Sequence, residues 1–286
     1  MDKVIFQFTR HLLSCNNISL GNKYYWGKDF EPGGTVYGIF ETIKYSQGKK
    51  SYFNFNHVYV SNLYRTWITA VLLYGTHVDS SETLHLYISP YLKEKDKFSM
   101  GITIKRGNFP MKITHMASKF LKFLEEMYNY FTNTSRDKMY REIMTSDWYE
   151  RLPNTIVIHL PPNGNKTQEM IYVKSGIGMY KLTSFCRIKD LSGPKSGKEF
   201  TKYRKFQLKM FMNWFNSGKN YYQKKIDHNN RVHVVAHSNM MREYLNMFNI
   251  KGATQTIPFD INAIKHEYLG KVRNSNSWHF ITTLGK

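Results

Sequence analysis

The sequence predicts an α/β fold in which a mostly parallel central sheet lies between two layers of helices. Short β-branched and aromatic segments alternate along the chain with segments that carry apolar residues at helical spacing, and this alternation is typical of parallel strands joined by crossover helices. The 286 residues, 41% hydrophobic and 16% aromatic, are sufficient for one large core. We therefore expect a three-layer α/β/α sandwich.

The first part of the chain is expected to form three strands and two helices. The segment 4–8 (VIFQF) is β-branched and aromatic, which favours a buried strand. A Pro-Gly-Gly turn precedes a helix expected over 36–45. The strand 57–60 runs into a Ser-Asn pair, a typical helix start, and the helix 63–74 follows it. An alternating segment at 83–89, closed by a proline, is the third strand.

The middle of the chain, residues 96–197, has a different pattern of apolar and polar residues and is predicted to be mixed α/β. Its clearest element is an amphipathic helix over 112–133, where aromatic and aliphatic residues recur at helical spacing. We also expect a helix near 136–149, strands at 155–160, 171–173 and 179–182, a turn at 161–166 and a linker at 192–197.

The last part of the chain returns to the pattern of the first. An aromatic-rich helix is expected over 199–215 and an apolar strand over 231–236. The strand ends at His237, and the segment 240–248 after it is predicted to be helical. The strand–helix alternation on both sides of the middle segment predicts one discontinuous core.

The composition restricts the environment and the partners of this protein. Forty-one Lys and Arg against 21 Asp and Glu give a net charge of +20, which favours an anionic partner such as a phosphorylated molecule, nucleic acid or an acidic membrane surface. Cys15 and Cys186 cannot build a disulfide framework, so a reducing, cytoplasmic location is expected. No apolar run approaches the roughly 18 residues of a membrane span, and the charged N-terminus does not resemble a secretory signal.

Two of the predicted strands end in the same way, in an apolar segment followed by a histidine. His11 comes directly after Arg10, and His237 is followed by Ser238. Ligands of open α/β sheets bind outside the carboxyl ends of the strands, so the two histidines are expected to face one crevice. Arg65, in the first turn of the helix after the strand 57–60, is expected to join them.

This set of side chains suits phosphoryl transfer. A neutral imidazole is a nucleophile near pH 7. Two guanidinium groups can hold the phosphate oxygens and stabilise the charge that spreads over them in the transition state. The other histidines show no spacing typical of metal ligands, so neither a metal nor another cofactor is predicted.

The same segments resemble four motifs of the histidine phosphatase superfamily, whose fold is called phosphoglycerate mutase-like. Residues 10–17 (RHLLSCNN) resemble the R-H-G-x-S-x-x-N signature, with Leu12 in place of its glycine. Residues 61–70 (SNLYRTWITA) resemble the S-x-L-x-R-x-x-x-T-A motif. Residues 234–242 resemble the strand of the second histidine, and 257–264 resemble the closing N-x-[SA]-I strand. The motifs occur in the order of the family.

The resemblance covers about residues 1–95 and 198–286, which would form the catalytic core. The interval from Glu94 to His237 is long for the family, so the resemblance implies that residues 96–197 are an inserted cap segment within the same domain. It implies that His11 is the nucleophile of a phosphohistidine mechanism and that Arg10, Arg65 and His237 form the phosphate pocket. It also implies that Asn17, with Ser238 beside the second histidine, contacts the substrate. The family keeps the position of Leu12 small, so its side chain must be accommodated in another way.

The general acid is assigned by the same resemblance. The family branch carries it in an L-x-E context after the third strand, which corresponds to Glu94 in this chain. Glu82 and Asp96 are the alternatives to Glu94. A general acid of this kind needs a raised pKa to hold its proton near neutrality.

These observations predict a metal-independent phosphomonoesterase for a phosphorylated small molecule or a phosphoprotein. The alternatives are a phosphomutase of the same family and a non-catalytic basic protein that binds phosphate or nucleic acid. Nucleic acid is the less favoured partner and a membrane is not expected. The sequence carries no signal for an oligomeric state.

Overall fold

A computed structural model describes eleven parts of the chain. These are residues 4–12, 14, 34, 36–92, 113–132, 149–163, 166–175, 179–184, 207–216, 224–237 and 279–284. The elements are β1 (Val4–Arg10), α2 (Val36–Gly48), α3 (Lys50–Phe53), β2 (His57–Val60), α4 (Tyr64–Tyr74), β3 (Thr83–Ile88), the short 3₁₀ helix η1 (Pro90–Leu92), α6 (Ile113–Thr132), β4 (Thr155–Asn163), β5 (Lys166–Lys174), β6 (Tyr180–Ser184), α9 (Gln207–Asn216), β7 (Arg231–Ala236) and β8 (His279–Leu284).

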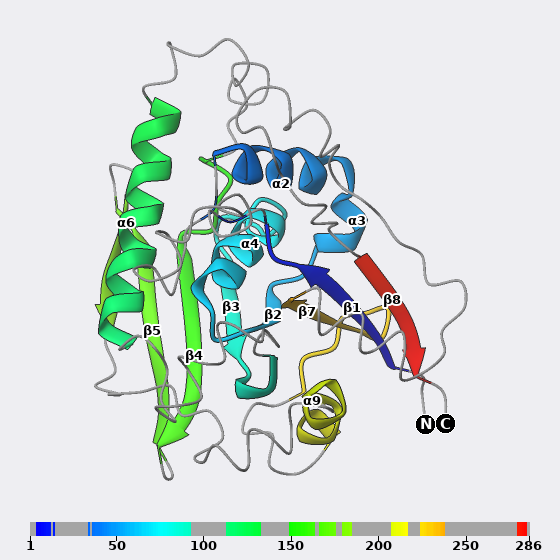
Figure 1. Cartoon of the computed structure of the whole chain (residues 1–286). Coiled ribbons are helices and arrows are strands. Elements are labelled where there is room, and N and C mark those ends of the chain that lie inside the picture. Colours follow the sequence, from blue (N-terminus) through cyan, green and yellow to red (C-terminus); the bar gives the residue numbers. More distant parts are fainter. Residues whose placement is uncertain are drawn as a thin grey trace, which may run out of the picture.

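The strands form one eight-stranded sheet in the order β6-β5-β4-β3-β2-β7-β1-β8 (Figure 1). Its central strands, β4, β3, β2, β7 and β1, are parallel to one another. The antiparallel strands lie at the two edges, with β5 and β6 on one side and β8 on the other. The mixed α/β prediction with a mostly parallel centre is therefore confirmed.

Helix α4 lies in the core on one face of the sheet. All its residues are buried, although it begins with Tyr64 and Arg65. Trp67 meets Phe120 of α6 edge-on, with ring centroids 5.9 Å apart, and α4 also contacts α2, β2, β3 and β7. Because α4 is enclosed on all sides, the side chains of its first turn are held in fixed positions.

Helix α9 packs on the opposite face of the sheet (Figure 1). Phe215 meets Phe6 of β1 with ring centroids 5.2 Å apart and Tyr59 of β2 at 5.5 Å. On the neighbouring positions of β1, which face the other way, Gln7 donates to the carbonyl of Tyr52 in α3. The alternation along the strands thus provides an apolar surface for helices on both faces.

The described residues of the predicted insertion extend the sheet laterally. Strand β4 pairs with β3 in parallel, and β5 and β6 follow it as antiparallel strands. The expected turn at 161–166 is wrong in extent, because β4 continues to Asn163 and pairs there with Lys166. Strand β8 was not expected. The predicted helices at 136–149 and 240–248, the linker at 192–197 and the closing strand at 257–264 lie outside the described residues or almost entirely so.

Within the part of the chain that the structure describes, no helix combines the length and the apolar character needed to cross a bilayer.

Candidate active site

The pairing of β1 with β7 brings the two predicted histidines together. Arg10 is opposite Ala236 in the parallel register, and the ladder continues through the main-chain N–H of His11, which donates to the Ala236 carbonyl at 2.9 Å. His11 and His237 therefore lie side by side at the carboxyl ends of two adjacent strands. Their ring centroids are 5.1 Å apart and the rings are inclined by 59°. Both side chains are buried.

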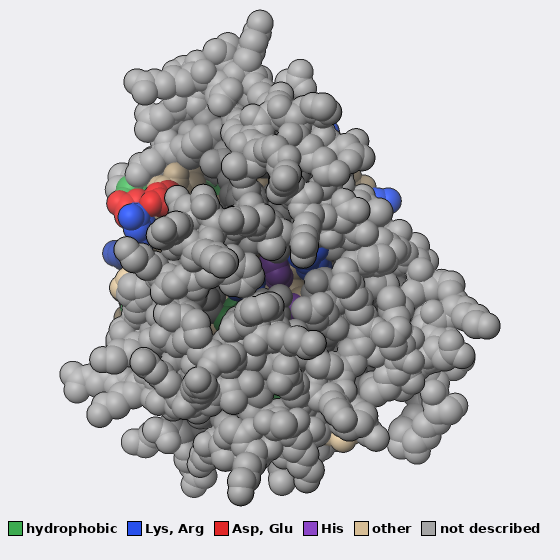
Figure 2. All heavy atoms as spheres, viewed as in Figure 1, with side chains coloured by type: hydrophobic (Ala, Val, Ile, Leu, Met, Phe, Trp, Pro, Cys, Tyr) green, Lys and Arg blue, Asp and Glu red, His purple; other side chains and the backbone are tan. Residues whose placement is uncertain are grey.

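Two arginines complete this group of cationic side chains. Arg10 ends β1 and Arg65 is the second residue of α4; only 8% and 5% of their surfaces are exposed. Figure 2 shows histidine atoms next to Lys or Arg atoms near the centre of one face of the molecule. We refer to Arg10, His11, Arg65 and His237 as the His11 cluster. Sequence and structure agree on these four residues as one group in space.

Electrostatics keep both imidazoles of the His11 cluster neutral at pH 7. Burial lowers the pKa of His11 well below its usual value, and the charges of Arg65, His237 and Arg10 lower it further. Burial likewise lowers the pKa of His237, followed by the charges of Arg65 and Arg10. A neutral imidazole retains a lone pair, which a nucleophile needs.

A hydrogen bond of His11 determines which ring nitrogen carries that lone pair. The Nδ1 atom lies 2.7 Å from the main-chain carbonyl oxygen of Leu12. Because a carbonyl can only accept, Nδ1 carries the proton and the lone pair is on Nε2. His11 is therefore oriented by its own chain neighbour, with Nε2 as the reactive atom.

His237 is oriented by the end of β2. Its Nε2 atom lies 2.9 Å from the Oγ of Ser61. The Ser61 hydroxyl donates to Oδ1 of Asn62 at 3.2 Å and accepts from the main-chain N–H of Leu63 at 3.2 Å. The hydroxyl proton is thereby used, so Nε2 of His237 is the donor to Ser61.

The loop after His11 is tied to the helix that carries Arg65. The main-chain N–H of Leu12 donates to Thr69 Oγ1 at 2.8 Å, and Thr69 in turn donates to the carbonyl of Arg65 at 2.7 Å. Ser61 and Thr69 are the Ser and Thr of the S-x-L-x-R-x-x-x-T-A segment. Neither residue was predicted to have a role, although their place in the motif was a signal.

Three residues predicted for the site, Glu94, Asn17 and Ser238, lie outside the described residues, as does the alternative acid Asp96. The other alternative acid, Glu82, is exposed and directly precedes β3. Strand β3 is parallel to the strands that carry the His11 cluster. Glu82 therefore lies at the amino-terminal ends of these strands, whereas the cluster lies at their carboxyl ends, and Glu82 cannot act on a substrate bound at the cluster.

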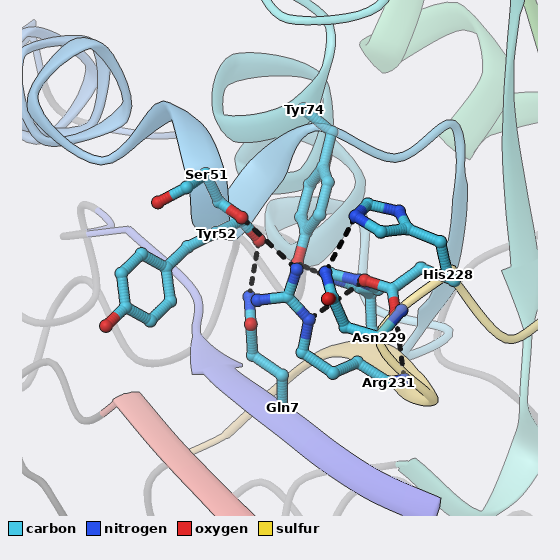
Figure 3. Close-up of polar contacts among 9 residues, drawn as sticks. Gln7, Ser51, Tyr52, Tyr74, His228, Asn229 and Arg231 are labelled. Carbon is cyan, nitrogen blue, oxygen red and sulfur yellow. Dashed lines mark hydrogen bonds and ion pairs between the residues drawn. The ribbon is translucent and has the colours of Figure 1, made fainter.

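A second group of histidine and arginine lies at the other end of β7 (Figure 3). Asp227 Oδ2 accepts from His233 Nε2 at 2.8 Å and from Arg231 Nε at 2.9 Å. His233 Nδ1 lies 3.3 Å from the hydroxyl of Tyr74, and Arg231 also donates to the carbonyl of Ser51. We call Asp227, Arg231 and His233 the Asp227 cluster. It links β7 to α3 and α4.

A third group consists of one histidine from each of three neighbouring strands. His57, His85 and His159 stack with ring centroids 4.7 and 5.1 Å apart, and Glu169 accepts from His159 at 2.9 Å. Burial, followed by the charge of a neighbouring His or Lys side chain, lowers the pKa of each histidine to about 4. Among the described residues, no three His, Cys, Asp or Glu side chains are arranged to hold a metal ion.

Comparisons with known proteins return distant likenesses only. No family model and no curated protein matches the sequence. A phosphoserine phosphatase from Entamoeba histolytica, solved with 3-phosphoglyceric acid, is 14% identical, with a TM-score of 0.22 over 65% of this chain and 98% of that one. A histidine-to-alanine mutant of the phosphatase, with phosphoserine, is 17% identical, with a TM-score of 0.20 over 63% and 95%. Likenesses this distant support no statement about activity.

Proposed function

We propose that this protein is a metal-independent phosphomonoesterase of the histidine phosphatase type, with a phosphoglycerate mutase-like core. The observation that carries the proposal is the His11 cluster. It consists of two buried histidines and one buried arginine at the carboxyl ends of adjacent parallel strands, with a second buried arginine in the first turn of α4. The motif resemblance of residues 10–17 and 61–70 supports the same assignment.

In the first step, Nε2 of His11 attacks the phosphorus atom of the substrate. A new N–P bond forms as the P–O bond to the leaving group breaks, and the leaving oxygen takes a proton from a general acid. In the second step, the deprotonated acid takes a proton from the water that attacks the phosphohistidine, the N–P bond breaks and inorganic phosphate leaves. The hydrogen bond from Nδ1 of His11 to the Leu12 carbonyl supports this division of roles, because it leaves Nε2 free to react.

Arg10 and Arg65 would bind the phosphoryl oxygens and stabilise the negative charge that develops on them. In the ligand-free site their charges lower the pKa of His237. A bound phosphate dianion would offset those charges, so His237 would take up a proton and become a further donor. Asn17 and Ser238 are proposed as additional substrate contacts.

Glu94 is proposed as the general acid. The described chain stops two residues earlier, at Leu92, which is buried in η1. The main-chain N–H of Ser89 donates to the Val60 carbonyl at 3.0 Å, so η1 follows β3 at the sheet edge where Ser61 holds His237. This position of η1 at the end of β3 supports Glu94, two residues after Leu92, as the general acid.

The substrate is proposed to be a phosphorylated small molecule or a phosphoprotein. The net charge of +20 favours a polyanion and faster association with it at low ionic strength. The assignment to the hydrolase class distinguishes this proposal from a phosphomutase, which would pass the phosphoryl group to a second organic acceptor.

The test is release of phosphate from an aryl phosphate between pH 4 and 9, in the presence of a chelator. We compare the wild type, His11→Ala and His228→Ala, in which an exposed histidine outside the His11 cluster is removed. We expect the wild type and His228→Ala to be equally active and His11→Ala to lose activity by about 10⁴-fold or more. Unchanged turnover in His11→Ala would contradict the proposal. Transfer of phosphate to an organic acceptor in preference to water would instead indicate a mutase.

A further inference from the structure

Leu12 is the main-chain link between the two sides of the His11 cluster. Its carbonyl accepts from Nδ1 of His11, and its N–H donates to Thr69, which is bonded to Arg65. Both main-chain polar groups of Leu12, its N–H and its carbonyl, are therefore used in the site. A displacement of Leu12 by a few tenths of an ångström would lengthen both hydrogen bonds together.

The side chain of Leu12 points into the core and ends against Gly34. Leu12 is 2% exposed and belongs to the main hydrophobic cluster. A Cβ atom at position 34 would lie 2.8 Å from Cδ1 and 3.1 Å from Cδ2 of Leu12, and 3.3 Å from Cγ1 of Ile39. Real Cβ atoms do not approach carbon atoms as closely as 2.8 Å, so a side chain at position 34 requires Leu12 to move.

Gly34 is also held next to this loop by its own main chain. It forms an isolated antiparallel bridge with Ser14, two residues after Leu12. Position 34 therefore cannot easily retreat from Leu12 when a methyl group is added. The contact is a packed pair between a large residue on one segment and a glycine on the other.

We infer that Gly34 is a positioning residue of the proposed active site: by leaving room for Leu12, it keeps the Leu12 carbonyl on Nδ1 of His11 and so holds Nε2 as the nucleophile. The inference rests on the proposed function. It explains how the chain accommodates leucine directly after the nucleophile, at the position where the histidine phosphatase signature has glycine.

The consequence for Gly34→Ala is a change in the chemistry of His11. The atoms that clash are the ends of the Leu12 side chain, which is buried. Because close packing limits the rotamers open to a buried side chain, we expect part of the displacement to reach its main chain. Once the carbonyl moves away, Nδ1 loses its acceptor and His11 also populates the tautomer with the proton on Nε2. That tautomer has no lone pair on Nε2 and cannot attack phosphorus.

The experiment compares four ¹⁵N-histidine-labelled proteins: wild type, Gly34→Ala, the double variant Leu12→Ala/Gly34→Ala, and Gly48→Ala. Gly48 is the matched control, because the same added methyl group meets nothing within 4 Å at that position. The ¹⁵N chemical shifts of the His11 ring report its tautomer without any substrate, and a His11→Asn spectrum assigns the signals. Phosphate release from an aryl phosphate is measured on the same samples.

We expect wild type and Gly48→Ala to show the Nδ1–H tautomer of His11. Gly34→Ala should lose a large part of that signal and release phosphate about 10- to 100-fold more slowly. The double variant should regain most of the Nδ1–H signal, because the shorter side chain at position 12 removes the clash. An unchanged tautomer in Gly34→Ala, or no recovery in the double variant, would overturn the inference.

The outcomes separate this inference from the proposed function. If the tautomer shifts and recovers as expected but no protein releases phosphate, the phosphatase assignment fails while the positioning role of Gly34 stands. If wild type releases phosphate and Gly34→Ala behaves like Gly48→Ala, only the positioning role fails. Should Gly34→Ala not fold alone, Leu12→Met/Gly34→Ala takes its place. The unbranched methionine keeps atoms against position 34, so a smaller tautomer shift is expected, with the same recovery in the Leu12→Ala double variant.

Discussion

The two ends of strand β7 both place a histidine beside arginine, but the charges around the two histidines differ in sign. At the start of the strand, Asp227 accepts hydrogen bonds from His233 and Arg231 and works to raise the pKa of His233 against the effect of burial. At the end of the strand, burial and the charges of Arg65 and Arg10 all lower the pKa of His237.

The comparison shows how the same residue types serve two purposes. In the Asp227 cluster the chain supplies its own anion, so the cations are neutralised within the fold and the group connects β7 to α3 and α4. In the His11 cluster, the charges acting on the two histidines within the described chain are those of the arginines and of the neighbouring histidine. An anion from outside would lower the electrostatic energy of this second group, and the phosphate of the proposed substrate would be such an anion.

The largest expected effect comes from replacing the histidine at each end of β7 by glutamine. His237→Gln should slow phosphate release by about 10²–10³-fold, because it removes one donor to the transition state. It should leave the free energy of unfolding close to that of the wild type. His233→Gln should lower the free energy of unfolding, while the folded fraction of this variant should release phosphate at a nearly normal rate. Urea unfolding and turnover measured on both variants check the prediction, and equal losses of activity would contradict it.

Asp227→Asn should mainly affect stability. Removal of the buried carboxylate leaves Arg231 without its ion pair, and we expect a loss of about 3 kcal/mol in the free energy of unfolding. Asp79→Asn, the same substitution in an exposed turn, is the control and should cost much less. Denaturant unfolding of the two variants gives the comparison, and a loss no larger than that of Asp79→Asn would show that the Asp227 cluster is not structural.

The Asp227 cluster also has a pH dependence with a defined sign. Burial works to raise the pKa of Asp227, but hydrogen bonds from His233, Arg231 and Asn229 lower it below its usual value. The unfolded chain therefore binds a proton that the folded chain does not, and this stability is lost as the pH falls below the usual carboxyl range. Asp227→Asn should remove that part of the acid sensitivity.

Arg65→Gln should raise the pKa of both His11 and His237, because Arg65 is the largest charge that lowers them. We also expect phosphate to bind about 10-fold more weakly, since one charge-assisted hydrogen bond is lost. NMR titration of the ring signals and calorimetry with inorganic phosphate measure the two effects. Arg231→Gln is the matched control at the other end of the sheet. If it raised the pKa values of the His11 cluster equally, the two groups would not be electrostatically separate.

The smallest expected effect concerns the third group, the stacked His57, His85 and His159. Their pKa values of about 4 lie below the 6.5 of an ordinary histidine. Between about pH 4 and 6.5 the unfolded chain therefore binds more protons than the folded chain. The stability they provide is complete above about pH 6.5 and falls as the pH drops toward 4. His85→Asn should flatten this dependence in unfolding experiments at several pH values, whereas exposed His228→Asn should not.

Most elements of the fold could be predicted from local patterns. The strands 57–60 and 231–236 and the helices near 36–45, 63–74 and 112–133 agree with β2, β7, α2, α4 and α6 to within a few residues. In these segments the apolar residues recur at a regular spacing, which can be recognised in the sequence alone. Strand β8 was missed because its sequence, HFITTL, is short and pairs only at the sheet edge, where partners far along the chain determine whether it forms.

The His11 cluster was predictable for a related reason. A histidine that ends an apolar strand can be recognised in the sequence, and the carboxyl ends of parallel strands share one edge of the sheet. The roles of Ser61, Thr69 and Gly34 could not be recognised in this way. Each acts through a contact with a residue far along the chain, and only the packing of β1, β2, β7 and α4 creates those contacts.

The sequence by itself determined the alternation of strands and helices, the excess of positive charge and the four residues of the His11 cluster. The tertiary structure decided what surrounds each charged group. It joined Asp227 to His233 and Arg231 and left the arginines at the other end to act on His11 and His237. It also placed Gly34 against Leu12. The physical reason is that periodicity is encoded in neighbouring residues, whereas pKa values, hydrogen-bond partners and steric clearance depend on distances that exist only after the chain has folded.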